Sequence, residues 1–193
     1  MVKLETCDII LWKNIKSDPI SELSRWAIGP YSHVAMYIKR FEGVPMVYES
    51  RGRGVVIASL LSQTGMPVAV MRPLFHLIKL CHHYSPQTFI PLRSQLVKTA
   101  FEIAADEKSF YDYFCIMYSC IPRILKEKFP WLPLPVKYHR DIFMICSEAV
   151  AEIFWQNEVD VISEKVVPLP GDFAESLFLK YVGEGKLMED IVP

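Results

Sequence analysis

The chain has 193 residues, of which 51% are hydrophobic, and its formal net charge at pH 7 is −1. This length suits a single domain spanning residues 1–193 with a substantial buried core. The composition excludes an intrinsically disordered chain, and the balanced charge gives no reason to expect a nucleic-acid partner.

Five cysteines at irregular spacing argue against a disulfide framework and favour a reducing compartment. Acidic residues interrupt the apolar positions near the N-terminus, so the sequence predicts no signal peptide. No apolar run approaches the roughly 20 residues of a membrane-spanning helix. We therefore expect a cytoplasmic protein. No cofactor is expected, and no metal either, because Cys81-His82-His83 has no second ligand cluster at zinc spacing.

The first part of the chain consists of short apolar runs, rich in β-formers, between turn signals. These runs are residues 7–12, 32–38, 45–50, 55–57 and 67–71. A polar loop and a short helix over residues 20–28, ended by Gly29-Pro30, separate the first two runs. The short connections between the later runs predict antiparallel pairing, and the whole region is predicted to be a β-meander.

The second part has helical patterns. Residues 74–91 show no clear period, residues 92–106 carry an apolar stripe at helical spacing, and an aromatic stretch over 110–129 is predicted to be a helix interrupted by Pro122. A proline-rich connector leads to a helix that begins at Cys146, and Asp172 is predicted to cap a last short helix. A sheet followed by helices indicates the α+β class, with the antiparallel sheet first.

Cys146 is a candidate nucleophile. The first N–H groups of a helix lack internal partners, and the helix dipole places partial positive charge there, so a thiol at this position is biased toward thiolate. A cysteine beside an apolar run is, taken alone, more often a small buried hydrophobic residue.

His33 and Glu49 are the candidate partners of this cysteine. Each has a structural alternative, because a lone strand histidine is often structural and Glu49 could lie at a solvated strand end. Together with Cys146, however, they supply a thiolate, an imidazole base and a group that orients the imidazole. Because His33 and Glu49 fall on adjacent strands of a predicted hairpin, the carboxylate can lie beside the imidazole.

Short segments across nearly the whole chain resemble, in order, a known family. These segments are Asp8-Ile9-Ile10-Leu11, Ser32-His33-Val34-Ala35-Met36-Tyr37-Ile38, Val47-Tyr48-Glu49-Ser50, Gly54-Val55, Tyr111-Asp112-Tyr113, Cys146-Ser147-Glu148-Ala149-Val150 and Pro170-Gly171-Asp172-Phe173-Ala174. They resemble a YiiX-like group in the circularly permuted branch of the NlpC-type superfamily of papain-like cysteine peptidases.

The resemblance implies a permuted papain-like fold in which the nucleophile helix comes late in the chain. It implies Cys146 as nucleophile, His33 as base and Glu49 as orienting acid. Tyr31, Tyr111 and Ser147 are candidates for substrate binding. Secreted relatives carry a signal peptide, so its expected absence here argues against a cell-wall peptide as substrate.

The sequence thus predicts a cysteine peptidase or amidase that cleaves an amide or ester bond of a small peptide-like or acylated substrate through a thioester. An acyltransferase at the same site, and a non-catalytic binding module for acylated or lipid-like ligands, are the alternatives. The aromatic residues of 110–140, with nearby basic residues, have two interpretations: a core helix with a solvated flank, or a lid or lipid-contacting surface that would touch a membrane.

Overall fold

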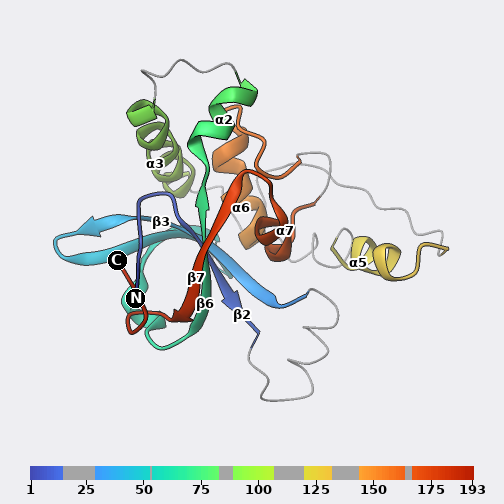
Figure 1. Cartoon of the computed structure of the whole chain (residues 1–193), viewed down its shortest axis with the longest axis horizontal. Helices are drawn as coiled ribbons and strands as arrows, with labels where there is room; N and C mark the ends of the chain where they lie inside the picture. The colour runs from blue at the N-terminus through green and yellow to red at the C-terminus, as the bar shows by residue number, and fades with distance from the viewer. Residues whose placement is uncertain (15–28, 53, 83–88, 107–119, 132–143, 164–166) are drawn as a thin grey trace.

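The computed structural model describes residues 1–14, 29–52, 54–82, 89–106, 120–131, 144–163 and 167–193. Its main feature is a six-stranded sheet in the order β5-β4-β3-β2-β6-β7, in which all neighbours are antiparallel. The strands are β2 (Ile9–Lys13), β3 (Tyr31–Phe41), β4 (Val44–Arg51), β5 (Gly54–Ser59), β6 (Pro67–Pro73) and β7 (Leu179–Lys186). Two further strands, β1 (Val2–Lys3) and β8 (Ile191–Val192), form a parallel pair that brings the two ends of the chain together (Figure 1).

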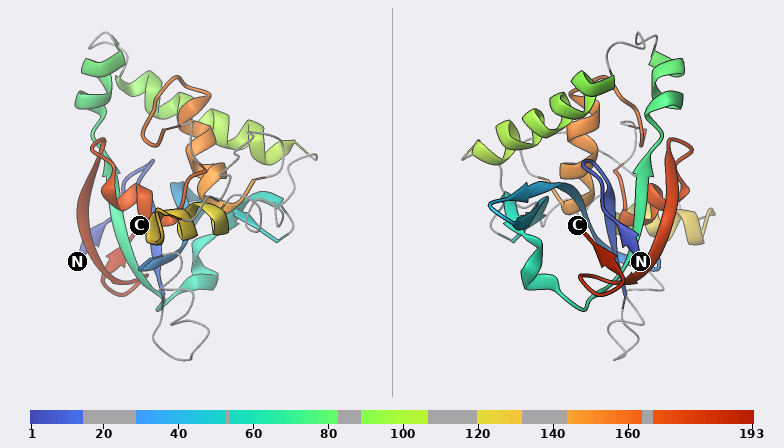
Figure 2. Two further views of the ribbon diagram at one scale, coloured as in Figure 1. Left: turned by 90° about the vertical axis from the view of Figure 1, so that its right-hand side faces the viewer. Right: turned by 60° about the vertical axis from the view of Figure 1, so that its left-hand side comes forward.

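The helices gather on one side of this sheet (Figures 1 and 2). They are α2 (Phe75–His82), α3 (Phe89–Ala105), α6 (Cys146–Trp155) and α7 (Pro170–Glu175), while α5 (Ile121–Lys128) lies at the periphery. A single 3₁₀ turn, η1 (Leu60–Gln63), follows β5. The sheet and these helices make the molecule α+β.

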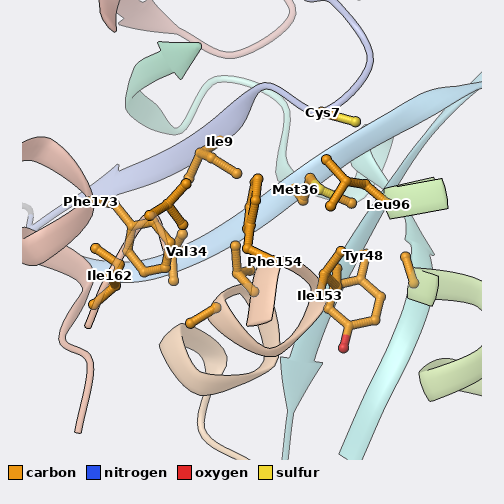
Figure 3. Close-up of a cluster of buried hydrophobic side chains, with 14 of the residues drawn as sticks. Cys7, Ile9, Val34, Met36, Tyr48, Leu96, Ile153, Phe154, Ile162 and Phe173 are labelled. Carbon is orange, nitrogen blue, oxygen red and sulfur yellow. The ribbon is translucent and has the colours of Figure 1, made fainter. Parts of the chain in front are cut away.

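The alternation of side chains along β3 divides the core into two clusters. Val34, Met36 and Ile38 belong to the cluster on the side of the helices. Figure 3 shows Val34 and Met36 in this cluster with Phe154 of α6 and Phe173 of α7. On the other face, residues of β2, β3, β4 and β6 pack with η1, β8 and the chain ends. Successive residues of a strand point to opposite faces of the sheet. Because both faces of this sheet are covered, both sets of β2 side chains are apolar, which explains its continuous apolar run.

The predicted meander is correct for β2 to β5 but wrong for β6. β6 pairs with β2 rather than with β5, because the chain turns through η1, buries Leu60 in the second cluster and returns on the far side of β2. A central strand with both faces buried must pair on both edges to satisfy its backbone groups, and β6 supplies the second partner.

Two further elements were not predicted from the sequence. Residues 74–91, which show no clear period, contain α2, and the C-terminal segment adds β7 to the sheet edge. Pro122 lies in the first turn of α5, where its missing N–H removes no hydrogen bond within this helix. The expected helix over 20–28 and the aromatic residues 110–119 lie outside the described residues.

The short helix α7 forms where Asp172 was predicted to cap it. The carboxylate accepts the backbone N–H of Leu169 at 2.7 Å from the third helical position rather than from the cap position itself. It also forms a two-pronged ion pair with Arg123 of α5, at 2.7 and 2.8 Å. This pair holds the peripheral α5 against α7.

No helix among the described residues is long and apolar enough to cross a membrane.

Candidate active site

His33 and Glu49 meet across the hairpin of β3 and β4. His33 Nε2 lies 2.7 Å from Glu49 Oε2. Met36 pairs with Tyr48, and continuing this antiparallel register sets Glu49 diagonally across from His33. Diagonal neighbours on one face are within reach of long side chains, so the strand pairing itself brings these two groups into contact.

Cys146 is the first residue of α6, and two hydrogen bonds hold this end of the helix. The Glu148 carboxylate accepts the backbone N–H of Ile145 at 3.0 Å, which satisfies a donor that the helix leaves free. Ser50 of β4 donates from Oγ to the carbonyl of Met144 at 2.8 Å. The second bond ties the start of α6 to the strand residue that follows Glu49.

The Cys146 side chain lies close enough to the His33 imidazole to raise the pKa of His33. Because Glu49 holds Nε2, the free ring nitrogen for this contact is Nδ1. Sulfur, imidazole and carboxylate are therefore neighbours, and the imidazole is hydrogen-bonded to the carboxylate. The Cys146 residue is 6% exposed and the His33 side chain 26% exposed, so the imidazole is the more accessible of the two groups.

The pKa of His33 reflects competing influences. Burial is the largest and by itself lowers the pKa, but the hydrogen bonds and charges of Cys146 and Glu49 outweigh it and raise the pKa from 6.5 to about 9. The imidazole is therefore protonated at neutral pH.

Glu49 is completely buried, and three side chains converge on it. Besides His33, Arg51 forms an ion pair with Oε1 at 2.5 Å, and Gln63 of η1 donates from Nε2 to Oε1 and Oε2 at 3.3 and 3.5 Å. Burial, the largest influence, raises the pKa of Glu49, but the hydrogen bonds and charges of His33 and Arg51 lower it overall. Glu49 is thus an ionised carboxylate at neutral pH.

A cavity of about 570 Å³ opens beside this pair. Its wall includes His33, the Trp12 indole, and side chains from β4, η1 and the loop after η1. The Trp12 and His33 rings lie 5.2 Å apart at an angle of 60°, so the indole forms a flat apolar wall against the imidazole. A substrate entering this cavity meets the imidazole directly.

The three predicted substrate-binding residues are placed differently. Tyr31 is half-buried at the start of β3, opposite Lys13. The hydroxyl of Ser147 is fully buried and donates to the carbonyl of Pro168 at 2.7 Å, so it serves the packing of α6 rather than an open surface. Tyr111 lies outside the described residues.

Arg51 and Gln63 contact the carboxylate but were not singled out from the sequence. The sequence spacing could have indicated the contact of Arg51 with Glu49. Arg51 follows Glu49 by two residues, and residues two apart on a strand lie on the same face. Gln63 had no comparable signal, since its contact depends on how η1 folds back against β4.

No protein-family model matches the chain, and a search of curated proteins found no match. Among solved structures, the chain is similar to the crystal structure of metalloprotein yiiX from Escherichia coli O157:H7, with a TM-score of 0.57 and 18% sequence identity. The match covers 94% of this chain and 98% of that chain. It supports a structural relation to YiiX-like proteins, and at this identity the likeness concerns the fold alone.

Proposed function

We propose that the chain is a cysteine-dependent hydrolase of an amide or ester bond, with a permuted papain-like fold. The observation that carries the proposal is the 2.7 Å contact of His33 with the buried, ionised Glu49, with the Cys146 side chain next to the same imidazole at the start of α6. A nucleophile, a base and a group that orients the base are the three parts that covalent acyl transfer needs.

In the first half of the proposed reaction, the Cys146 thiolate attacks the carbonyl carbon of the substrate. The carbonyl oxygen becomes an oxyanion, which the backbone N–H groups at the start of α6 can stabilise. The His33 imidazolium then gives its proton to the leaving nitrogen or oxygen as the bond to the carbonyl carbon breaks. The products of this half are a thioester on Cys146, a neutral His33 and the released amine or alcohol.

In the second half, neutral His33 takes a proton from water, and the resulting hydroxide oxygen attacks the thioester carbonyl. The carbon–sulfur bond breaks, the acid leaves, and the Cys146 thiolate and the His33 imidazolium are restored. Throughout, Glu49 accepts the Nε2 hydrogen bond of His33, which keeps Nδ1 directed toward the sulfur. We propose that the cavity beside His33 receives part of a small peptide-like or acylated substrate.

The similar solved structure is that of a metalloprotein. Here Cys146 and His33 offer two ligands, but Glu49 is already engaged by His33, Arg51 and Gln63. No group of three or more His, Cys, Asp and Glu side chains is placed to hold a metal ion in the part of the chain that the structure describes. This donor set does not fit a zinc centre, which takes three or four protein ligands, and the proposed reaction uses no metal.

An iodoacetamide-based thiol probe tests the assignment. Wild-type protein should be labelled rapidly at neutral pH, and Cys146→Ala should lose this labelling while its circular dichroism spectrum stays unchanged. Cys120→Ala is the matched control, because Cys120 is another buried free cysteine, and it should label like the wild type. Equal labelling of wild type and Cys146→Ala would contradict the proposal.

Turnover is tested on a panel of acyl-amide and acyl-ester substrates, with and without an amine acceptor and with and without EDTA. The proposal expects release of free acid that depends on Cys146 and persists in EDTA. Transfer of the acyl group to the amine in preference to water would identify an acyltransferase using the same thioester. Tight ligand binding without either product would instead identify a non-catalytic binding module.

A further inference from the structure

Two side chains besides His33 contact the carboxylate of Glu49. It has no exposed surface, its Oε2 faces His33 at 2.7 Å, and its Oε1 is ion-paired with Arg51. Gln63 Nε2 reaches both oxygens, at 3.3 and 3.5 Å. The position and the plane of the carboxylate are therefore set by residues from β4 and from η1.

A buried carboxylate that orients a catalytic imidazole has a specific difficulty. Removal from water favours its protonated form, and a nearby positive charge is needed to keep it ionised. His33 supplies that charge only while it is an imidazolium. In the proposed reaction His33 becomes neutral once it has protonated the leaving group, and Glu49 would then be a buried anion without a counter-charge.

Arg51 removes this difficulty because a guanidinium stays protonated at every pH of interest. Its side chain is 42% exposed, so solvent reaches the cation while the partner oxygen stays fully buried. A pair with one member wholly desolvated is less screened than an ordinary surface ion pair. Arg51 thus provides a charge next to Glu49 that does not change during the reaction.

Gln63 contributes orientation instead of charge. Its Nε2 donates to Glu49, while its Oε1 is buried and has no hydrogen-bond partner among the described residues. Reversing the amide would place Oε1 against an ionised carboxylate, so the carboxylate dictates the orientation seen here. A buried acceptor left unpaired is unfavourable, and the contact with Glu49 is what Gln63 gains in exchange.

We propose that Arg51 and Gln63 are positioning residues of the active site: they touch no reacting atom and act by holding Glu49 ionised and directed at His33. This inference rests on the proposed function, since it assigns their role in that reaction. It makes the site a set of five side chains from β3, β4, η1 and α6.

The first measurement needs no turnover. Protein labelled with ¹³C in the glutamate side-chain carboxyl is titrated by NMR, and the Glu49 resonance is identified as the one missing from Glu49→Gln. Arg51→Met should raise the pKa of Glu49 by about one pH unit, the low end of the effect of an opposite charge at this distance because Arg51 is partly exposed. Arg51→Lys should raise it less, since a cation remains without the planar fork.

The second measurement is the pH dependence of Cys146 alkylation and of kcat/KM. Arg51→Met should move the acid limb of both profiles to higher pH by the same amount as the Glu49 titration, with KM little changed. Gln63→Leu should lower kcat about tenfold with a smaller displacement of the acid limb, as expected for lost orientation. Arg40→Met is the matched control, because Arg40 lies exposed at the far end of β3 and bonds only backbone carbonyls of Gly43 and Pro193 among the described residues. It should change none of these quantities.

The results separate this inference from the proposed function. An unchanged Glu49 titration in Arg51→Met overturns the inference, whatever the activity. A raised pKa of Glu49 with unchanged acid limbs overturns it as well, because the ion pair would then serve only the fold. If wild-type Cys146 is neither reactive nor catalytic, the proposed function fails and the catalytic role of Arg51 falls with it, while the titration still measures its charge effect on Glu49.

Discussion

Replacing Glu49 by Gln removes the negative charge beside His33 while keeping the size and shape of the side chain. In the wild type, the pKa of His33 is raised from 6.5 to about 9 against the effect of burial, by Cys146 first and Glu49 second. At about 1.4 kcal/mol per pH unit, this favours the charged imidazole by roughly 3 kcal/mol. Glu49 supplies the smaller share, so we expect Glu49→Gln to lower the pKa of His33 by about one unit.

The assay follows the His33 ring protons by NMR between pH 5 and 10, with the resonance assigned from a His33→Gln spectrum. The basic limb of kcat/KM should move to lower pH with the His33 titration, because a neutral imidazole has no proton to give to the leaving group. At pH 8 we expect a drop in kcat/KM of about tenfold or more, combining lost protonation with a less well-oriented imidazole.

Glu49→Gln should also change how the free energy of unfolding depends on pH. A group whose folded-state pKa is raised contributes stability that is fully present below its unfolded value and is lost as the pH rises through the folded value. For His33 this stability is therefore lost between pH 6.5 and about pH 9. The stability difference between wild type and Glu49→Gln should therefore narrow across this window, measured by urea denaturation at several pH values.

Glu42→Gln, in the exposed turn between β3 and β4, is the matched control. It should leave the pKa of His33 and the pH dependence of the free energy of unfolding unchanged. A His33 titration that is the same in wild type and Glu49→Gln would refute the reasoning. It would mean that the 2.7 Å contact between the two side chains does not couple their charges.

Two further predictions concern the start of α6. Ser50→Ala deletes the bond that ties this helix to β4, so we expect a loss of about 1–3 kcal/mol in urea denaturation together with a lower kcat. Ser62→Ala, at an exposed hydroxyl in η1, should cost less than about 0.5 kcal/mol, and an equal effect of the two would count against the role of Ser50. Ser147→Ala removes a buried hydroxyl that donates to a backbone carbonyl, so it should lower stability by a similar 1–3 kcal/mol and leave KM unchanged. A rise in KM without loss of stability would instead place this hydroxyl at the substrate.

Local pattern was enough to predict most of the strands and the two main helices of the described region. The alternation along β3 separates Val34, Met36 and Ile38 from Ala35 and Tyr37, and the structure buries these two sets in different clusters. Period-2 and helical spacing report which face of an element is apolar, and burial of that face drives the local fold. The same information predicted a helix beginning at Cys146 and a hairpin carrying His33 and Glu49.

Pattern failed where the outcome depended on partners remote in sequence. Helix α2 and the edge strand β7 show no clear local period, and no local pattern predicts that β6 pairs with β2. The burial of these elements is set by the segments that cover them. Tertiary packing can override weak local preferences, and in this chain it does so at the edges of the sheet and at its connections.

The sequence by itself determined which groups were available: a thiol at a helix start, and an imidazole and a carboxylate on neighbouring strands. Only the tertiary structure decided that they meet. The bond from Ser50 to the backbone before α6 brings Cys146 to the hairpin, and Arg51 and Gln63 surround the carboxylate. The physical reason is that periodicity encodes the direction in which a side chain points. Hydrogen bonds and charges between distant segments exist only after those segments have packed together.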